Sequence, residues 1–134
     1  MINCHRPVGK SVFGIHDPMY LRYLFQLRLR LSSLRSHKVR YGFADTPSKT
    51  CLCRRGAEDT RHFLLLCPFY NSKRDALKKS VNEILVKNNL NYPANFPVQE
   101  LNLILYGLPK ISLADNRSIL KATLKYIKET NRFS

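Results

Sequence analysis

The chain has 134 residues, of which 44% are hydrophobic, and its mean hydropathy of −0.30 predicts one soluble globular domain rather than a disordered chain. No apolar run approaches the ~20 residues of a membrane span, so we expect no membrane partner. The formal net charge of +14 and the pI near 10 favour a polyanionic partner, above all RNA or DNA.

The positive charge is concentrated in the first part of the chain. Residues 1–55 carry 11 Lys and Arg against 2 Asp and Glu, a balance of +9, whereas residues 56–134 carry 12 against 7, a balance of +5. The segment Met1–Lys10 is polar and lacks the apolar stretch of a secretory signal. We therefore expect an intracellular protein that is not secreted and whose thiols stay reduced.

The first predicted elements are an arm and a basic helix. Residues 1–16 show no hydrophobic periodicity and are predicted to form an extended arm. Asp17 and Pro18 predict a helix start, because Asp caps helices and Pro suits the first helical position. Apolar residues then recur at intervals of three and four, which predicts one face of a helix over residues 18–36: Leu24, Leu27, Leu31 and Leu34.

The middle of the chain holds three cysteines and one histidine in the pattern Cys-x-Cys-x8-His-x4-Cys: Cys51, Cys53, His62 and Cys67. A Cys3His set is one of the usual tetrahedral shells of Zn²⁺, and all four positions are filled by protein, so we predict one structural zinc ion. Two alternatives stay open, namely ordinary buried cysteines with a surface histidine, and a disulfide from Cys67 to Cys51 or Cys53. The remaining Cys4 is expected to be a free thiol on the arm.

The spacing of the two nearest cysteines allows both sulfurs to reach one ion. Cys51 and Cys53 are two residues apart, and in an extended segment such residues point to the same side. Gly56 is the residue expected where the chain must then turn back sharply.

Of the other two ligands, one is predicted to lie within a short helix over residues 60–66 and the other directly after it. Asp59 is expected to cap this helix, and His62 lies in its first turn. Pro68 forces the preceding Cys67 out of helical geometry, which frees its sulfur to face the metal.

Three further helices are predicted over residues 69–87, 98–106 and 113–130, separated by breaks rich in Asn, Gly and Pro. The apolar run Leu103–Leu105 would also fit a strand. Ser112 is predicted to cap the last helix, with Asp115 in the capping-box position.

The predicted fold class is thus mostly α, with about four helices and a compact Cys3His zinc knuckle between the first two. We expect a single domain over residues 1–134. Its predicted parts are the extended arm 1–16, the basic helix and loop 17–50, the zinc knuckle 51–68 and the helical tail 69–134.

The run from Cys51 to Pro68 combines a Cys pair, Gly56, an acidic pair before Thr60, a His-Phe-Leu-Leu stretch and Cys-Pro. In this it resembles the cysteine/histidine module at the C-terminal end of non-LTR retrotransposon reverse transcriptases of the jockey-like type. The stretches 27–38 and 119–133 also resemble that family. The resemblance implies a detached tail of such a polyprotein or a host gene derived from one, with a nuclear site of action.

The polymerase and endonuclease domains of that family have no counterpart in these residues, so we expect no enzyme activity. No Ser/His/Asp set or Gly-rich phosphate loop stands out either, and no small-molecule substrate is expected. The alternatives to nucleic-acid binding are a zinc-stabilised protein–protein interaction module, with other parts of a reverse transcriptase as partner, and a decayed transposon fragment without function.

The leading functional hypothesis is therefore a non-catalytic zinc module that contacts RNA or DNA. Phosphate contacts are expected from nine basic residues of the first helix, of the segment after it and of the knuckle: Arg22, Arg28, Arg30, Arg35, Lys38, Arg40, Arg54, Arg55 and Arg61. Phe69 and Tyr70 either stack on bases or belong to the core.

Overall fold

The computed structural model describes residues 17–133, and the predicted arm over residues 1–16, including Cys4, lies outside the described residues. The elements are α2 (Pro18–Leu29), α3 (Arg35–Arg40), the π-helix η1 (His62–Leu66), the 3-10 turn η2 (Pro68–Tyr70), α4 (Asn71–Lys87), α5 (Pro97–Tyr106) and α6 (Leu113–Thr130). Between residues 17 and 133 the β-structure amounts to an isolated bridge that joins Thr50 to Ala57. The predicted mostly α class is confirmed, but this part of the chain has five α-helices instead of about four.

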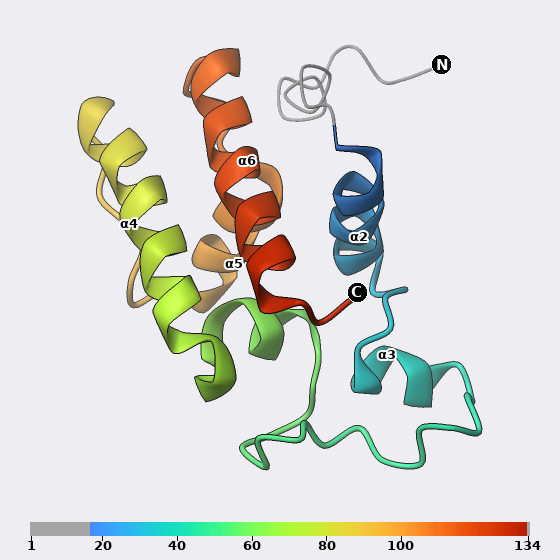
Figure 1. Cartoon of the computed structure of the whole chain (residues 1–134). Helices are drawn as coiled ribbons and strands as arrows, with labels where there is room; N and C mark the ends of the chain where they lie inside the picture. Colours follow the sequence, from blue (N-terminus) through green and yellow to red (C-terminus); the bar gives the residue numbers. More distant parts are fainter. Residues whose placement is uncertain (1–16, 134) are drawn as a thin grey trace.

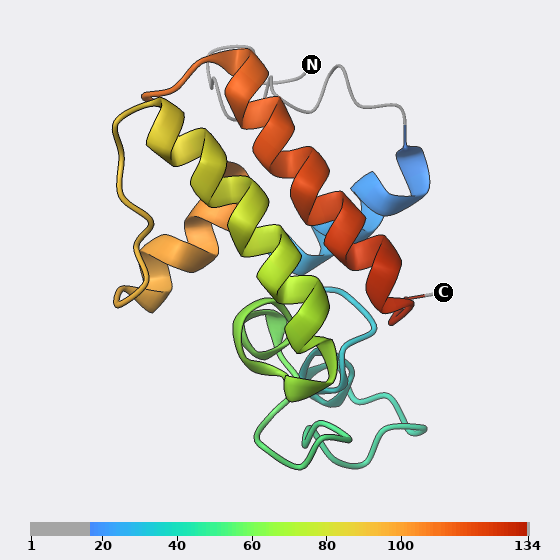
Figure 2. The same cartoon turned by 60° about the vertical axis from the view of Figure 1, so that its left-hand side comes forward.

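Helix α6 lies at the centre of the helical packing. It runs antiparallel to α4, on which it packs most extensively, and it also contacts α2 and α5 (Figure 1 and Figure 2). The long connection over residues 41–60 extends beyond the helices at the end where α4 begins and α6 finishes (Figure 1). Of the helices in residues 17–133, none has both the length and the apolar character that a bilayer crossing requires.

The core is formed by the apolar faces of α2, α4, α5 and α6 together with η1. Its most deeply buried side chains are Leu24, Leu27, Leu34, Phe63, Leu64, Val81, Leu85, Leu103, Ile104, Ile119, Leu120, Tyr126 and Ile127. Ser112 caps α6 as predicted, because its Oγ accepts the N–H of Asp115 at 3.1 Å. The predicted start of the last helix is therefore confirmed.

The predicted helix over residues 18–36 is wrong at its second half. Helix α2 ends at Leu29, and Arg30 takes the left-handed conformation with a φ of 58°. The N–H of Leu31 then donates to the C=O of Gln26 at 2.9 Å, a bond that closes the helix end. As a consequence Leu31, which was predicted to share one helical face with Leu24 and Leu27, is 50% exposed, whereas these two are buried.

A second helix, α3, starts after this break because other groups satisfy its first N–H groups. The Oγ of Ser32 accepts the N–H of Leu34 at 3.2 Å, a local bond that competes with helix continuation. The Oε1 of Glu58 accepts the N–H of Arg35, and the C=O of Glu58 accepts the N–H of Ser36, both at 2.9 Å. The Cys3His motif thus lies between the second and third α-helices of the described chain, not between the first two.

The connection between α5 and α6 requires glycine. Leu103–Leu105 is helical, so the alternative of a strand is wrong. Gly107 follows α5 with a φ of 76°, and a Cβ at this position would lie only 2.3 Å from the Oδ1 of Asn116. That amide holds the loop by bonding both the N–H and the C=O of Leu108 at 2.7 Å each.

Candidate metal centre and basic cleft

Cys51 and Cys53 lie in a tight loop that backbone hydrogen bonds close. The N–H of Cys51 donates to the C=O of Gly56 at 2.8 Å, and the N–H of Arg54 donates to the C=O of Cys51 at 2.9 Å. Gly56 has a φ of 153° and Arg54 a φ of 64°. The sharp turn predicted at Gly56 is confirmed, and it directs the segment back towards η1.

His62 and Cys67 are brought together by the π-helix. The N–H of Cys67 donates to the C=O of His62 at 2.7 Å, the five-residue bond that defines this helix type. In an α-helix, which turns by ~100° per residue, residues five apart lie on different faces, so the two ligands would be separated there. Asp59 caps the turn as predicted, since its Oδ1 accepts the N–H of His62 at 2.8 Å. Cys67 is extended, with a ψ of 122°, as expected before Pro68.

The four predicted ligands converge, and we refer to them as the Cys3His cluster: Cys51, Cys53, His62 and Cys67. Their ligand atoms all lie within 4.8 Å of one another and could hold a metal ion. The two Sγ atoms of Cys51 and Cys67 are 3.8 Å apart, and the Sγ of Cys53 lies 3.2 Å from the Nε2 of His62. All three cysteines are free, so the alternative of a disulfide is wrong.

Burial sets the electrostatics of this cluster. It raises the pKa of the Cys51 thiol, and it raises the pKa of the Cys67 thiol to about 12. Burial also acts to raise the pKa of the Cys53 thiol, but hydrogen bonds from the N–H of Arg55 and from the neighbouring thiols outweigh it, so this pKa is lowered. Burial lowers the pKa of His62, which favours the neutral, metal-binding imidazole. Buried thiols of this kind become thiolates when a cation lies between them.

Arg74 supports the cluster from α4 and was not identified from the sequence. Its side chain is buried, and it donates from Nε to the C=O of Leu64 at 3.0 Å and from Nη2 to the C=O of Cys67 at 2.7 Å. The same Nη2 lies 3.3 Å from the hydroxyl of Tyr126 on α6. Arg74 precedes Leu77 by three residues and therefore shares the apolar face of this helix. That spacing was the hint in the sequence that its side chain is buried.

Glu58 and Arg132 tie the cluster segment to the C-terminal end of the described chain. The carboxylate accepts from Nε and from Nη2 of Arg132, both at 2.7 Å. Burial acts to raise the pKa of Glu58, but the bonds from Arg132 and from the N–H of Arg35 outweigh it and hold that pKa below its usual range. The adjacent Phe133 packs edge-on against Phe63, with 5.3 Å between the ring centroids.

The nine predicted nucleic-acid-binding residues fall into three groups. Three line one cleft: Arg30, Arg40 and Arg61. Three others are exposed elsewhere: Arg22, Arg54 and Arg55. The last three make internal contacts: Arg28, Arg35 and Lys38.

The internal contacts of this third group reduce its availability for phosphate. Arg28 is half-buried, donates to the C=O of Leu105 at 2.8 Å and lies over the ring of Tyr106 at 4.6 Å. Lys38 pairs with the carboxylate of Asp45 at 2.8 Å.

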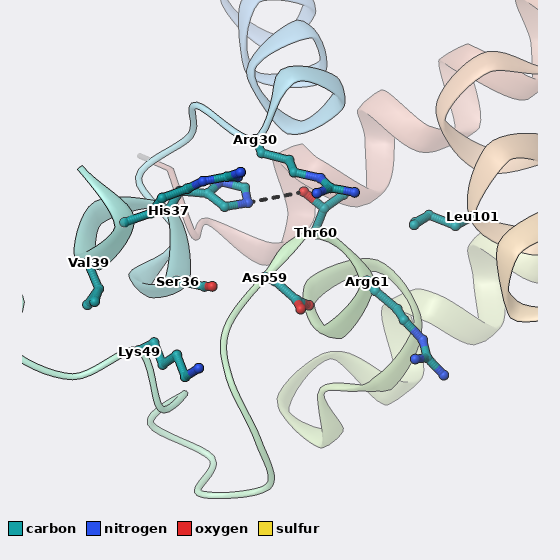
Figure 3. A pocket seen from close by; sticks show the side chains of 10 residues that line it. Arg30, Ser36, His37, Val39, Lys49, Asp59, Thr60, Arg61 and Leu101 are labelled. Atoms are coloured by element: carbon teal, nitrogen blue, oxygen red, sulfur yellow. Dashed lines mark hydrogen bonds between the residues drawn. The ribbon is translucent and has the colours of Figure 1, made fainter.

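The cleft has a volume of about 590 Å³ and opens between α3, the 41–60 connection and the start of η1 (Figure 3). Its lining residues are Arg30, Ser36, His37, Val39, Arg40, Lys49, Asp59, Thr60, Arg61 and Leu101. His37 is buried at its wall and accepts the N–H of Ser32 on Nδ1 at 3.3 Å. Its Nε2 therefore carries the proton and faces the hydroxyl of Thr60 at 3.5 Å, the contact dashed in Figure 3. Sequence reasoning did not single out His37 or Lys49.

The two predicted stacking residues are in different environments. Phe69 is 57% exposed, so the core alternative is wrong for it. Tyr70 is half-buried and packs edge-on against Phe63, with 5.5 Å between the ring centroids. Phe69 lies beside a second cleft, whose other lining residues include Cys51, Leu52 and Arg132.

Comparison with protein-family models, with curated proteins and with solved structures found no match to this chain.

Proposed function

We propose that this chain is a non-catalytic module that one Zn²⁺ ion organises and that binds nucleic acid, RNA or DNA, through its basic surface. The proposal rests above all on the convergence of the Cys3His cluster, whose ligand atoms lie within 4.8 Å of one another. Three thiolates and an imidazole suit Zn²⁺ and leave no coordination position for a catalytic water. A closed shell of this kind stabilises a fold and does no chemistry.

The separation between the two buried sulfurs of the cluster supports zinc as the ion. A tetrahedral ion with Zn–S bonds of ~2.3 Å separates its sulfur ligands by ~3.8 Å. Cys51 and Cys67 have this separation, 3.8 Å. Structural zinc binding is worth about 10–16 kcal/mol in finger peptides, as much as the whole stability of a small domain. Removal of the ion should therefore unfold the segment that holds it.

The charge of the molecule supports nucleic acid as the partner. The chain carries a net charge of +14, and six of the nine candidate basic side chains either line the cleft or are exposed elsewhere. Cations of this kind bind phosphate and release counterions, which makes the affinity strongly dependent on salt. The resemblance of residues 51–68 to the C-terminal module of non-LTR reverse transcriptases points to the same class of partner.

Binding to labelled single-stranded and duplex RNA and DNA at 50 and 200 mM salt tests this function. The zinc-loaded chain is expected to bind at 50 mM salt and to lose affinity steeply at 200 mM. The chain treated with a chelator serves as the control and should bind more weakly. Absence of binding to every probe at 50 mM salt would rule out the proposed partner.

Protein–protein interaction is the second candidate function, and two exposed apolar side chains beside the Cys3His cluster favour it. Leu52 is 73% exposed and Phe69 57% exposed, and both line a cleft of about 270 Å³. Replacing both by Ser would abolish docking of a protein partner there and leave the binding of nucleic acid to the basic cleft unchanged.

A further inference from the structure

Four cationic side chains on the basic cleft have no carboxylate or hydrogen-bond partner among residues 17–133: Arg30, Arg40, Lys49 and Arg61. All four are exposed. They come from four separate segments between residues 30 and 61. Figure 3 shows the Lys49 side chain on the loop that faces the segment carrying Asp59 and Arg61. Bringing four like charges to one concavity costs electrostatic energy that a bound anion would offset.

Other basic residues of this region contrast with these four. Lys38 pairs with Asp45, and Arg132 pairs with Glu58 in a bidentate contact. The acidic residue of the cleft is Asp59, and one of its oxygens is already held by the N–H of His62 at 2.8 Å. His37 stays neutral because burial lowers its pKa. The cleft therefore keeps an excess of positive charge.

Two exposed aromatic side chains follow the cleft directly along the chain. Tyr41 comes next after Arg40 and is 56% exposed, and Phe43 is 54% exposed. The ammonium of Lys38 lies 5.5 Å from the centroid of the Phe43 ring. Neither ring belongs to the hydrophobic core, although large aromatics usually contribute to it. Tyr41 and Phe43 are thus one and three residues beyond the cleft residue Arg40 in the chain. Groove cations together with exposed aromatic rings are a combination that binds unpaired nucleotides, with phosphates on the cations and bases on the rings.

We infer that this cleft is the binding site for the backbone of a single-stranded nucleic acid, and that Tyr41 and Phe43 stack on its bases. This inference rests on the proposed function and narrows its partner to an unpaired strand. A volume of about 590 Å³ lies in the range that encloses small-molecule-sized groups, such as one or two nucleotides. The rings could not stack on bases that are already paired within a duplex. The Oγ of Ser36 adds a hydroxyl beside the cations.

Fluorescence anisotropy with the zinc-loaded full chain tests the inference. The probes are labelled 12-nucleotide single strands of RNA and of DNA with the same mixed sequence, and the corresponding duplexes. The cleft variant combines Arg40→Gln, Lys49→Gln and Arg61→Gln. The control variant combines Lys79→Gln, Lys110→Gln and Lys121→Gln, which removes the same charge from exposed positions outside the cleft and outside the nine candidate basic residues. Circular dichroism and metal content verify that each variant is folded.

The cleft variant is expected to bind both single strands at least tenfold more weakly at 50 mM salt, and the control variant less than threefold more weakly. The slope of log K against log salt should become less steep by about 2 in the cleft variant, since three phosphate contacts are lost at ~0.7 each. A third variant with Tyr41→Leu and Phe43→Leu should lose about tenfold in affinity for single strands and none for duplexes.

Equal losses in the cleft and control variants would overturn the inference, and so would a wild-type preference for duplexes that the aromatic substitutions do not change. Both of these results would leave the proposed function standing. Failure of the wild-type chain to bind any probe would instead contradict the proposed function itself.

Discussion

Single buried side chains hold the candidate metal centre in place, and Arg74 is the clearest case. Its guanidinium donates to the carbonyls of Leu64 and Cys67, where η1 ends. The ligand types and their spacing were readable from the sequence. The role of Arg74 was not, because a basic residue on an amphipathic helix is usually solvated.

Arg74→Met is expected to lower the free energy of unfolding by about 3 kcal/mol, since it leaves two buried carbonyls without donors. Arg74→Lys should restore part of this loss. The measurement is urea unfolding of the zinc-loaded chain, with the exposed Lys79→Met as the matched control. A loss below about 1 kcal/mol for Arg74→Met would show that water satisfies these carbonyls equally well.

His37 predicts a pH dependence of stability. Burial lowers its pKa, and the charged groups that act on it are Asp59, Arg30, Arg40 and Glu58. Because the pKa is lower in the folded chain than the ordinary value of about 6.5, the unfolded chain binds the proton more tightly. The stabilisation from neutral His37 is thus complete above about pH 6.5 and declines as the pH falls below it.

His37→Asn should remove this dependence, since its Oδ1 can accept the N–H of Ser32 in place of Nδ1. The difference in unfolding free energy between wild type and variant, measured from pH 7.5 to 5.5, should shrink by up to about 1.4 kcal/mol per pH unit. Titration of the metal ligands is common to both proteins and cancels. A difference that is constant with pH would contradict the neutral assignment.

At the scale of elements, the sequence predicted each long helix after the cluster but not the break inside residues 18–36. Apolar spacing continued through Leu31 and Leu34, and no Gly or Pro marked the break. The decisive contact comes from Glu58, whose carboxylate accepts the first N–H of α3 from 23 residues away in sequence. Local patterns cannot report a cap that the tertiary structure supplies.

The pair between Glu58 and Arg132 should be coupled energetically. A double-mutant cycle with Glu58→Ala and Arg132→Ala is expected to give a coupling of about 2 kcal/mol, because the contact is bidentate and largely buried. The pair Lys38–Asp45, in which the Asp45 side chain is 67% exposed, is the matched control and should give less than about 1 kcal/mol. Similar values for the two cycles would mean that burial adds nothing to the first pair.

For the whole molecule, residue types and spacing were enough to predict a mostly α fold and the four members of the Cys3His cluster. Which of the basic residues share one surface was not predictable. Arg30, Arg40 and Arg61 meet because the chain reverses after α3 and again at Gly56, and these reversals also bring Lys49 beside them. The amino-acid composition gives the total charge of the molecule but not where the charged side chains lie on its surface.

On the proposed function, the same geometry should make the fold depend on the metal. The cluster segment contacts α3 through Glu58 and α4 through Arg74, so loss of the ion should reach beyond residues 51–67. Chelation is therefore expected to reduce helical circular dichroism and the binding of single strands together, and readdition of Zn²⁺ to restore both.

Native mass spectrometry of the full chain, purified without chelator, tests the central claim most directly. We expect the mass of one zinc ion per chain in the wild type, and its loss in a variant that combines Cys51→Ser with Cys67→Ser. A wild-type chain that carries no metal, and takes up none when Zn²⁺ is added under reducing conditions, would contradict the account.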